Sequence, residues 1–260
     1  DGVEAYAGAR EAFAAIRAAG KKTLLLSNAP RRADALVEQL GRMGIGRDMY
    51  DHVLSSGEAV HMELARRTDP FYAGLGHQLY HMGPERDRNV FEGLDLVAVD
   101  MEHADFILNT GPWDFTETVE DYVPKMQQGL ARNLPMICAN PDHLVMRQGQ
   151  KVVCAGALAA RYAEMGGTVS TRGKPDPAIY DVALEMLGVE RNRVLAVGDA
   201  LHTDIKGANS AGIRSVFVTQ GIHAEELGIH PGAEPEADML RTMVTRHGER
   251  PMAAIATFRW

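Results

Sequence analysis

The stretch VLAVGDALHTD, residues 194–204, says most about the fold of this chain. Its apolar residues predict a buried strand over Arg193–Val197 that ends in Gly-Asp, with a helix soon after. In an open α/β sheet, ligands bind at the carboxyl ends of the strands. Two carboxylates at such an edge, Asp199 and Asp204, suit a hard cation such as Mg²⁺. It stays open that Asp199 merely ends a strand and Asp204 merely caps a helix.

Upstream, the stretch RGKPDP covers residues 172–177. Asp176 fits the N-cap of a helix and Pro177 its first turn, so Lys174 lies on a stiff turn at a strand-end position. A lysine there can neutralise a phosphate or an aspartyl carboxylate as a point charge. The alternative is an exposed loop lysine.

A third strand-end signal is LLLSN, residues 24–28. An apolar strand ends in the hydroxyl of Ser27, and a helix begins a few residues later. A hydroxyl beside the N–H groups of a helix start can hold a phosphate. The alternative is that Ser27 or Asn28 only caps the following helix.

Strand and helix signals alternate in the first and last thirds of the chain, which predicts an α/β fold with a doubly wound parallel sheet. The middle has its own βα rhythm, flanked by the turn-rich stretches Thr68-Asp69-Pro70 and Asn140-Pro141-Asp142. We therefore expect a core domain of residues 1–66 and 143–260. We expect residues 68–141 to form an inserted second domain.

Composition excludes several classes of protein. The 260 residues are 45% hydrophobic and carry a formal net charge of −8, which argues against nucleic acid or an anionic membrane as a partner. No apolar run is long enough to span a membrane. Two cysteines are too few for a disulfide scaffold, so we expect a cytoplasmic location.

The hydroxyl of Ser27, the lysine and the acid pair follow one another along the chain. In this order the chain resembles the haloacid dehalogenase (HAD) superfamily of aspartate-nucleophile phosphohydrolases. The resemblance is strongest to its class IIA branch. It rests on LLSNAP near residue 27, GKPDPAIY at 173–180 and GDALHTDI at 198–205, which together span nearly the whole chain. SSGEA at 55–59 and ANPD at 139–142 extend it. The resemblance implies a Rossmann-like, HAD-type core with an inserted α/β cap domain.

The resemblance also implies roles for the residues. Ser27 would bind the oxygens of the transferred phosphoryl group, and Lys174 would balance charge on the nucleophile and that group. Asp199 would ligate Mg²⁺. Asp204 would bind the ion through water or orient Lys174. We add Asn28 as a substrate-binding residue.

The loop NTGPWDFT, residues 109–116, falls where caps of this family reach over the site. Trp113 and Asp114 are therefore candidate substrate-binding residues. The alternatives are a tryptophan in the core of the cap and an aspartate at a helix start near Thr116.

The family's nucleophile lies on its first core strand, in a motif that closes in Asp-Gly. Asp1-Gly2-Val3 could be the start of that motif, but too few residues would then precede Ala7-Gly8-Ala9, which resembles the family's next helix start. If Asp1-Gly2 instead closes the motif, this spacing fits. We prefer the second alignment. It places the nucleophilic aspartate about seven residues before Asp1 and predicts that the 260 residues alone do not turn over substrate.

We therefore expect an Mg²⁺-dependent phosphohydrolase that acts on a small phosphorylated metabolite through an aspartyl-phosphate. The alternative is a catalytically silent binding or scaffold protein of the same fold. A receiver-type signalling domain is excluded because it needs only about 120 residues and has no place for the insertion. The expected partner is the small-molecule substrate. A homodimer stays open, as does the identity of the substrate.

Overall fold

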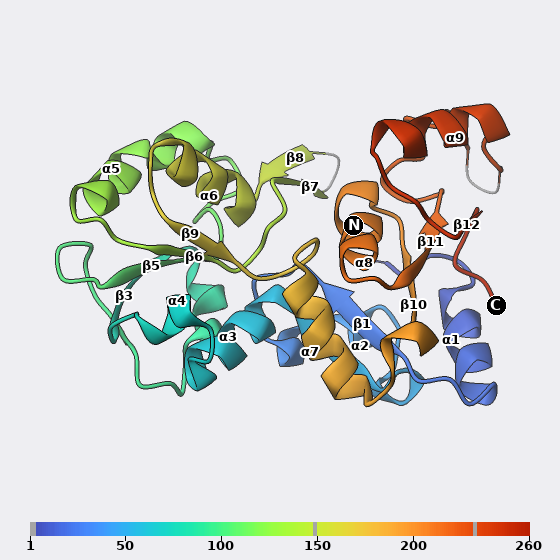
Figure 1. Cartoon of the computed structure of the whole chain (residues 1–260), viewed down its shortest axis with the longest axis horizontal. Helices are drawn as coiled ribbons and strands as arrows, with labels where there is room; N and C mark the ends of the chain where they lie inside the picture. Colours follow the sequence, from blue (N-terminus) through green and yellow to red (C-terminus); the bar gives the residue numbers. More distant parts are fainter. Residues whose placement is uncertain (1–3, 148–149, 231–232) are drawn as a thin grey trace. The chain divides into compact units, whose positions relative to one another are not determined.

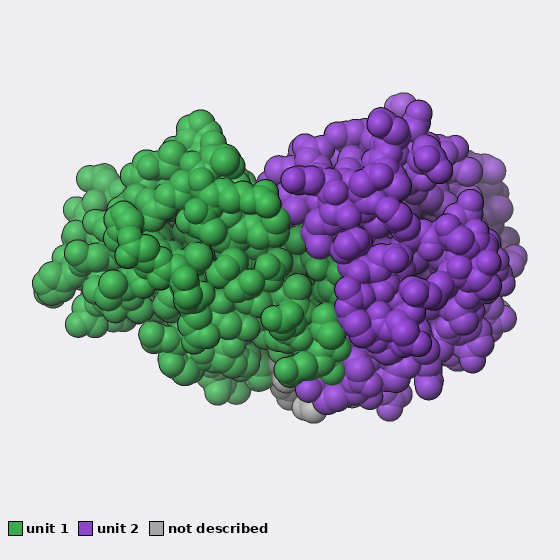
Figure 2. Space-filling view, turned by 90° about the horizontal axis from the view of Figure 1, so that it is seen from below, with its two compact units in different colours: residues 1–2, 26–39, 53–173 green, residues 3–25, 40–52, 174–260 purple. Residues whose placement is uncertain are grey.

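The computed structural model describes residues 4–147, 150–230 and 233–260. Asp1-Gly2-Val3, which enters the nucleophile prediction, lies outside these residues. The chain divides into two compact units, coloured differently in Figure 2. The first comprises residues 1–2, 26–39 and 53–173, and the second comprises residues 3–25, 40–52 and 174–260.

A five-stranded sheet with the order β4-β3-β5-β6-β9 organises the first unit, and all its strand pairs are parallel. The hairpin β7-β8 is antiparallel. The strands are β3 (Gln78–Met82), β4 (Val97–Ala98), β5 (Phe106–Asn109), β6 (Met136–Cys138), β7 (Leu144–Arg147), β8 (Gln150–Val153) and β9 (Val169–Thr171). The helices are α3 (Ser56–Arg66), α4 (Pro70–Ala73), α5 (Val123–Ala131) and α6 (Ala155–Glu164), with the 3₁₀ turns η2 (Glu85–Val90) and η3 (Val119–Tyr122).

Helices cover both faces of this sheet because its central strand is apolar on both sides. In β5, Ile107 packs with residues of α5 and α6, whereas Phe106 and Leu108 pack with residues of α3 and α4. Successive side chains of a strand point to opposite faces, so an uninterrupted apolar run supplies two cores at once. Figure 1 shows the two helix layers on either side of the sheet.

The first unit continues beyond Asn140-Pro141-Asp142. Val169–Thr171 pairs with Met136–Cys138, and the Tyr162 hydroxyl of α6 donates a hydrogen bond to the Leu134 carbonyl at 2.7 Å. The segment after residue 143 thus completes the five-stranded sheet and one of its helix layers. The predicted division, with an inserted domain of residues 68–141, stays a prediction.

The second unit is built on the three-stranded parallel sheet β10-β11-β12. Its strands are β10 (Leu195–Gly198), β11 (Arg214–Val218) and β12 (Ala253–Ile255). Its helical elements are α1 (Ala9–Ala18), η1 (Arg47–Met49), α7 (Pro177–Leu187), η4 (Arg191–Arg193), the π-helical turn η5 (Leu201–Ile205), α8 (Lys206–Ser210) and α9 (Ala237–Arg246). A separate two-stranded sheet pairs β1 (Leu24–Ser27) with β2 (His52–Ser55). These two strands and α2 (Ala33–Arg42) contain residues of both units.

The strand over Arg193–Val197 is present as β10, but the prediction that it is buried is wrong. Leu195 and Val197 are 48% and 42% exposed, respectively. The reason is that, among the described residues, β10 pairs with β11 alone and therefore lies at an edge of its sheet. The predicted α/β fold with parallel sheets and covering helices is confirmed. No helix of the described residues has the length and apolar character needed to cross a membrane.

Candidate active site

Strand β10 brings Asp199 and Asp204 into one tight turn. A Cβ atom on Gly198 would lie only 2.3 Å from the Cβ of Asp204, a distance that real Cβ atoms do not show. Glycine at position 198 therefore lets the chain leave the strand and return over its own end. The π-helical turn Leu201–Ile205 then carries Asp204 back toward the backbone of Asp199.

Both carboxylate oxygens of Asp204 have protein donors. Oδ1 accepts a hydrogen bond from Lys174 Nζ at 2.6 Å. Oδ2 accepts from the backbone N–H groups of Asp199 and Ala200, each at 3.1 Å. Asp204 thus joins Lys174 to the end of β10.

Lys174 and Asp204 form an ion pair that is largely shielded from water. Their side chains are 14% and 16% exposed. Asp176 caps α7 immediately after the lysine, its carboxylate accepting the N–H of Ala178 at 3.0 Å. From the same helix, the Tyr180 hydroxyl donates to the Asp204 carbonyl at 3.1 Å. Burial, and then the charge of Asp204, raise the pKa of Tyr180, so this phenol stays a donor at neutral pH.

Asp199 is held from the other side by the turn after β11. Its Oδ2 accepts the N–H of Ile222 at 3.0 Å. A Cβ on Gly221 would lie 2.0 Å from the same oxygen, so only glycine allows this close approach. Asp199 Oδ1 receives no hydrogen bond from the described residues.

This donor set fits a hard divalent cation. Mg²⁺ is held in proteins by one or two carboxylates and keeps several waters. Asp199 Oδ1 is available for direct ligation, whereas both oxygens of Asp204 are occupied by protein donors. Asp199 would therefore be the direct ligand. Of the two roles expected for Asp204, these contacts favour orientation of Lys174.

In the first unit, Ser27 ends β1 and turns the chain. Its Oγ accepts the N–H of Ala29 at 3.2 Å, which is a local turn contact. Asn28 is 6% exposed, and its amide is engaged on both sides. It donates to Asp142 Oδ1 at 2.7 Å and accepts from Ser56 Oγ at 3.3 Å. The contacts of Asn28 are therefore those of a residue that braces the loop after Ser27.

Trp113 and Asp114 differ in what holds them. The Trp113 ring stacks on Tyr122 with centroids 4.9 Å apart, and Trp113 is 40% exposed. One face thus belongs to the unit's own packing. The carboxylate of Asp114 accepts the N–H of Thr116 at 2.9 Å and its hydroxyl at 2.8 Å. These hydrogen bonds make Asp114 a turn-forming residue and lower its pKa.

The structure brings together Lys174, Asp199 and Asp204 in the second unit. Ser27, Asn28, Trp113 and Asp114 lie in the first unit, and the predicted convergence of both sets stays a prediction. The sequence analysis missed three partners of these residues: Asp142, Tyr180 and the turn Gly221-Ile222. Asp142 and Tyr180 stood inside stretches quoted for the resemblance. The turn had no sequence signal because its contribution is a backbone N–H.

Comparison with known proteins identifies the family. A HAD-hydrolase-like model matches residues 171–249, and a haloacid dehalogenase-like hydrolase model matches residues 1–97. The crystal structure of a haloacid dehalogenase-like family hydrolase from Brucella suis is 32% identical. It covers 98% of this chain, the chain covers 89% of it, and the TM-score is 0.81. The chain belongs to the haloacid dehalogenase-like hydrolase family.

Other similar proteins have names that state an activity. A 4-nitrophenylphosphatase from Thermotoga maritima is 25% identical with a TM-score of 0.73, and the match covers 97% of this chain and 88% of that one. An acid sugar phosphatase from Staphylococcus aureus is 28% identical over 153 residues, and a phosphoserine phosphatase from Thermus thermophilus is 37% identical over 91 residues. These matches cover 58% and 34%, respectively, of this chain and of the curated relatives alike.

Proposed function

We propose that this member of the haloacid dehalogenase-like hydrolase family is an Mg²⁺-dependent phosphatase of a small phosphorylated metabolite. The observation that carries the proposal is the shielded Lys174–Asp204 ion pair at the end of the strand that delivers Asp199. A lysine fixed by one carboxylate keeps its charge in place without reorganising during the reaction. Phosphoryl transfer depends mainly on such positioning and neutralisation.

The proposed mechanism gives each residue one task. Mg²⁺, when bound, would supply positive charge for the phosphoryl oxygens. Asp199 Oδ1 would hold the ion, Lys174 would neutralise the nucleophile and the phosphoryl group, and Asp204 would keep Lys174 oriented. Ser27, as implied by the resemblance, would hydrogen-bond a phosphoryl oxygen.

The chemistry would proceed in two steps. An aspartate oxygen attacks phosphorus, the ester P–O bond breaks and the alcohol leaves with a proton taken from solvent, forming an aspartyl-phosphate. Water then attacks that phosphorus, the P–O bond to the aspartate breaks, the carboxylate is regenerated and inorganic phosphate is released. The nucleophile would be the aspartate of the family's first motif.

The substrate class is a phosphomonoester of a sugar or another small polyol. This choice rests on the acid sugar phosphatase among the relatives. The exposed face of Trp113 adds a surface that suits a ring, because a tryptophan fixed by stacking on Tyr122 loses little freedom when a flat group packs on it.

Phosphate release from a panel of sugar phosphates, phosphoserine and p-nitrophenyl phosphate tests the proposal. The full product of the gene is assayed with Mg²⁺ and with EDTA, and the 260-residue chain is assayed beside it. We expect Mg²⁺-dependent turnover with the highest kcat/KM on a sugar phosphate. Lys174→Met should lower kcat by about a hundredfold or more.

Asp238→Asn is the matched control. Asp238 pairs with Arg241 at 2.9 Å, but the side chains are 92% and 75% exposed, and Asp238 has no part in the site. This variant should keep full activity. If the full product binds a phosphorylated metabolite saturably but releases no phosphate, the phosphatase proposal is wrong. The alternative of a catalytically silent binding protein would then be favoured.

A further inference from the structure

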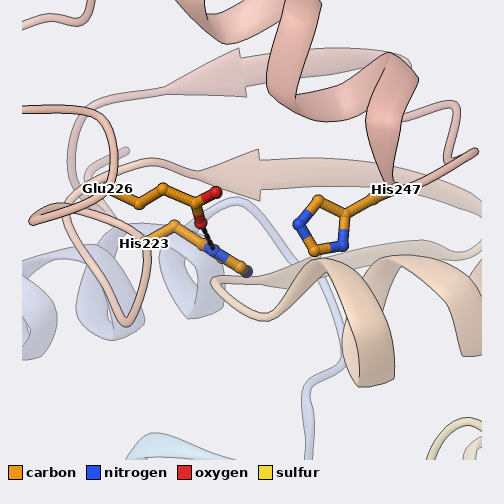
Figure 3. A group of neighbouring side chains, drawn as sticks. All are labelled: His223, Glu226 and His247. Atoms are coloured by element: carbon orange, nitrogen blue, oxygen red, sulfur yellow. Dashed lines mark hydrogen bonds and ion pairs between the residues drawn. The ribbon is translucent and has the colours of Figure 1, made fainter.

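A second group of side chains that could bind a metal lies in the second unit, apart from Lys174, Asp199 and Asp204. His223 and Glu226 come from the turn after β11, and His247 follows the last residue of α9. One ligand atom of each lies within 4.8 Å of the others. Figure 3 shows the three side chains converging from these two segments. This is the single group of three His, Cys, Asp or Glu side chains with such spacing in the part of the chain that the structure describes.

We propose that His223, Glu226 and His247 bind a divalent transition-metal ion of the zinc class. Two imidazoles and a carboxylate are a ligand set for Zn²⁺, Co²⁺ or Fe²⁺, whereas Mg²⁺ prefers oxygen ligands only. His223 Nδ1 and Glu226 Oε2 are 3.2 Å apart. Two ligands of one tetrahedral ion with bonds of about 2.0–2.1 Å lie roughly 3.3 Å apart. A ring nitrogen of His247 lies within 4.8 Å of these two atoms.

The surroundings of His247 favour metal binding, because they leave its ring nitrogens accessible. The His247 ring makes no hydrogen bond with a described residue, and its nearest aromatic neighbour is His223 at 5.3 Å between ring centroids. Arg246 pairs with the other oxygen of Glu226, which orients the carboxylate while leaving Oε2 toward His223.

Metal binding requires a defined proton shift on His223. Without metal, Nε2 accepts the N–H of Leu201 at 3.3 Å, so the ring proton lies on Nδ1 and points to Glu226. When Nδ1 takes the ion, that proton moves to Nε2, the ring stays neutral and the long Leu201 hydrogen bond is lost. The site therefore has a signature that ordinary surface histidines lack.

The proposed ion would join α9 to the turn that supports Asp199. Ile222, which donates its N–H to Asp199 Oδ2, directly precedes His223. Leu201, whose N–H contacts His223 Nε2, lies two residues after Asp199. The ion would thus be structural, fixing the backbone behind the active-site carboxylate. It is a binding site separate from the proposed phosphatase function and does not depend on it.

Calorimetric titration of the metal-free chain with Zn²⁺ alone, and absorption of the Co²⁺ form, test the proposal. We expect one tight Zn²⁺ per chain and a Co²⁺ spectrum of tetrahedral or five-coordinate type. His247→Ala and Glu226→Gln should each weaken Zn²⁺ binding at least about tenfold, because each removes a direct ligand. A substitution of His223 is not used as the main test, because it would also remove the acceptor of the Leu201 N–H.

Two controls separate this ion from others. His230→Ala changes an exposed histidine of the same segment and should bind Zn²⁺ like the parent. Asp199→Asn should also keep tight Zn²⁺ binding, even if the phosphatase proposal fails. Nitrogen NMR of the histidine rings should show His223 changing from the Nδ1–H to the Nε2–H form on addition of Zn²⁺. Undiminished Zn²⁺ affinity in His247→Ala, or an unchanged His223 tautomer at saturation, would overturn the proposal.

Discussion

Asp204 is the residue on which the geometry of the site depends most. It accepts one ion-pair hydrogen bond and two backbone hydrogen bonds. Removing a partner from a shielded charge pair leaves the other charge uncompensated, and unpaired N–H groups add to that cost.

Asp204→Ala should lower the free energy of unfolding by about 2–4 kcal/mol, with the partial exposure of the pair already taken into account. Urea denaturation of the variant and the parent chain measures this. Asp238→Ala, which breaks a surface pair, should change the same quantity by less than about 0.5 kcal/mol. Equal, small effects of the two changes would show that the Lys174–Asp204 contact does not exist in solution.

Asp87 is a buried acid whose titration should be visible in stability. Its side chain is 3% exposed and Oδ1 has no hydrogen-bond partner among the described residues. Burial raises its pKa to about 6, and the charges of Arg86 and Arg31 offset only part of the rise. The folded state therefore binds this proton more tightly than the unfolded chain, whose carboxyl titrates near 3.8.

It follows that this carboxyl's contribution to stability is lost as pH rises from about 4 to about 6. The Asp87→Asn variant has no ionisable group at this position. At pH 7 the variant should be more stable than the parent by up to about 3 kcal/mol, and at pH 4 the difference should disappear. Denaturation of both proteins at a series of pH values measures this. A stability difference that does not vary with pH would disprove the assignment.

At the scale of the element, the N-cap of α7 positions the turn that holds Lys174. Asp176 accepts the Ala178 N–H at 3.0 Å, so Asp176→Ala should cost about 1 kcal/mol of stability. Asp176→Asn keeps a side-chain acceptor and should cost less than about 0.5 kcal/mol. Thermal unfolding of both variants measures these costs. Equal stabilities of the Ala and Asn variants would show that the Asp176 side chain does not stabilise α7 as a cap.

Elements with strong local signals were predicted well. Helix α7 begins at the cap that Asp176 and Pro177 predict, and it ends at Gly188. The run before Gly166-Gly167 predicts a helix over Ala155–Met165, and α6 covers Ala155–Glu164. The apolar run Phe106–Leu108 likewise predicts the strand β5. The stretch Thr116–Ala131 favours a single helix, whereas the structure has a 3₁₀ turn followed by α5, with Pro124 in its first turn.

Elements whose existence depends on distant partners were missed. Strand β9 has three residues and is a strand because it pairs with β6. The same holds for β12, which pairs with β11. Burial of β10 was misjudged for the same reason, since an apolar run does not reveal how many neighbours its strand has.

At the scale of the whole molecule, the end of the inserted domain at residue 141 is testable. A fragment of residues 68–141 lacks α6 and β9, including the fully buried Leu158 and Tyr162. We expect it to show no cooperative thermal transition by circular dichroism, whereas a fragment of residues 53–173 should unfold cooperatively. Cooperative unfolding of the shorter fragment would support the predicted boundary.

The candidate site was predictable in its residue types and only partly in its contacts. Asp199 and Asp204 were chosen as two carboxylates near a strand end, and Lys174 because it lies on a stiff turn. The structure joins the three residues through hydrogen bonds that the Asp204 carboxylate accepts from the Lys174 ammonium and the Asp199 backbone. The brace formed by Asn28 and Asp142 could not be predicted, because it spans 114 residues of sequence. The His223, Glu226 and His247 group likewise joins a turn to the end of a helix.

The central claim is that Asp199 holds the cation of a phosphatase. The most direct test is the rate of p-nitrophenyl phosphate hydrolysis by the full product of the gene and its Asp199→Asn variant, each with Mg²⁺ and with EDTA. We predict that the parent loses its activity in EDTA and that the variant is inactive in both conditions while its circular dichroism is unchanged. Hydrolysis that survives both EDTA and Asp199→Asn would contradict the claim.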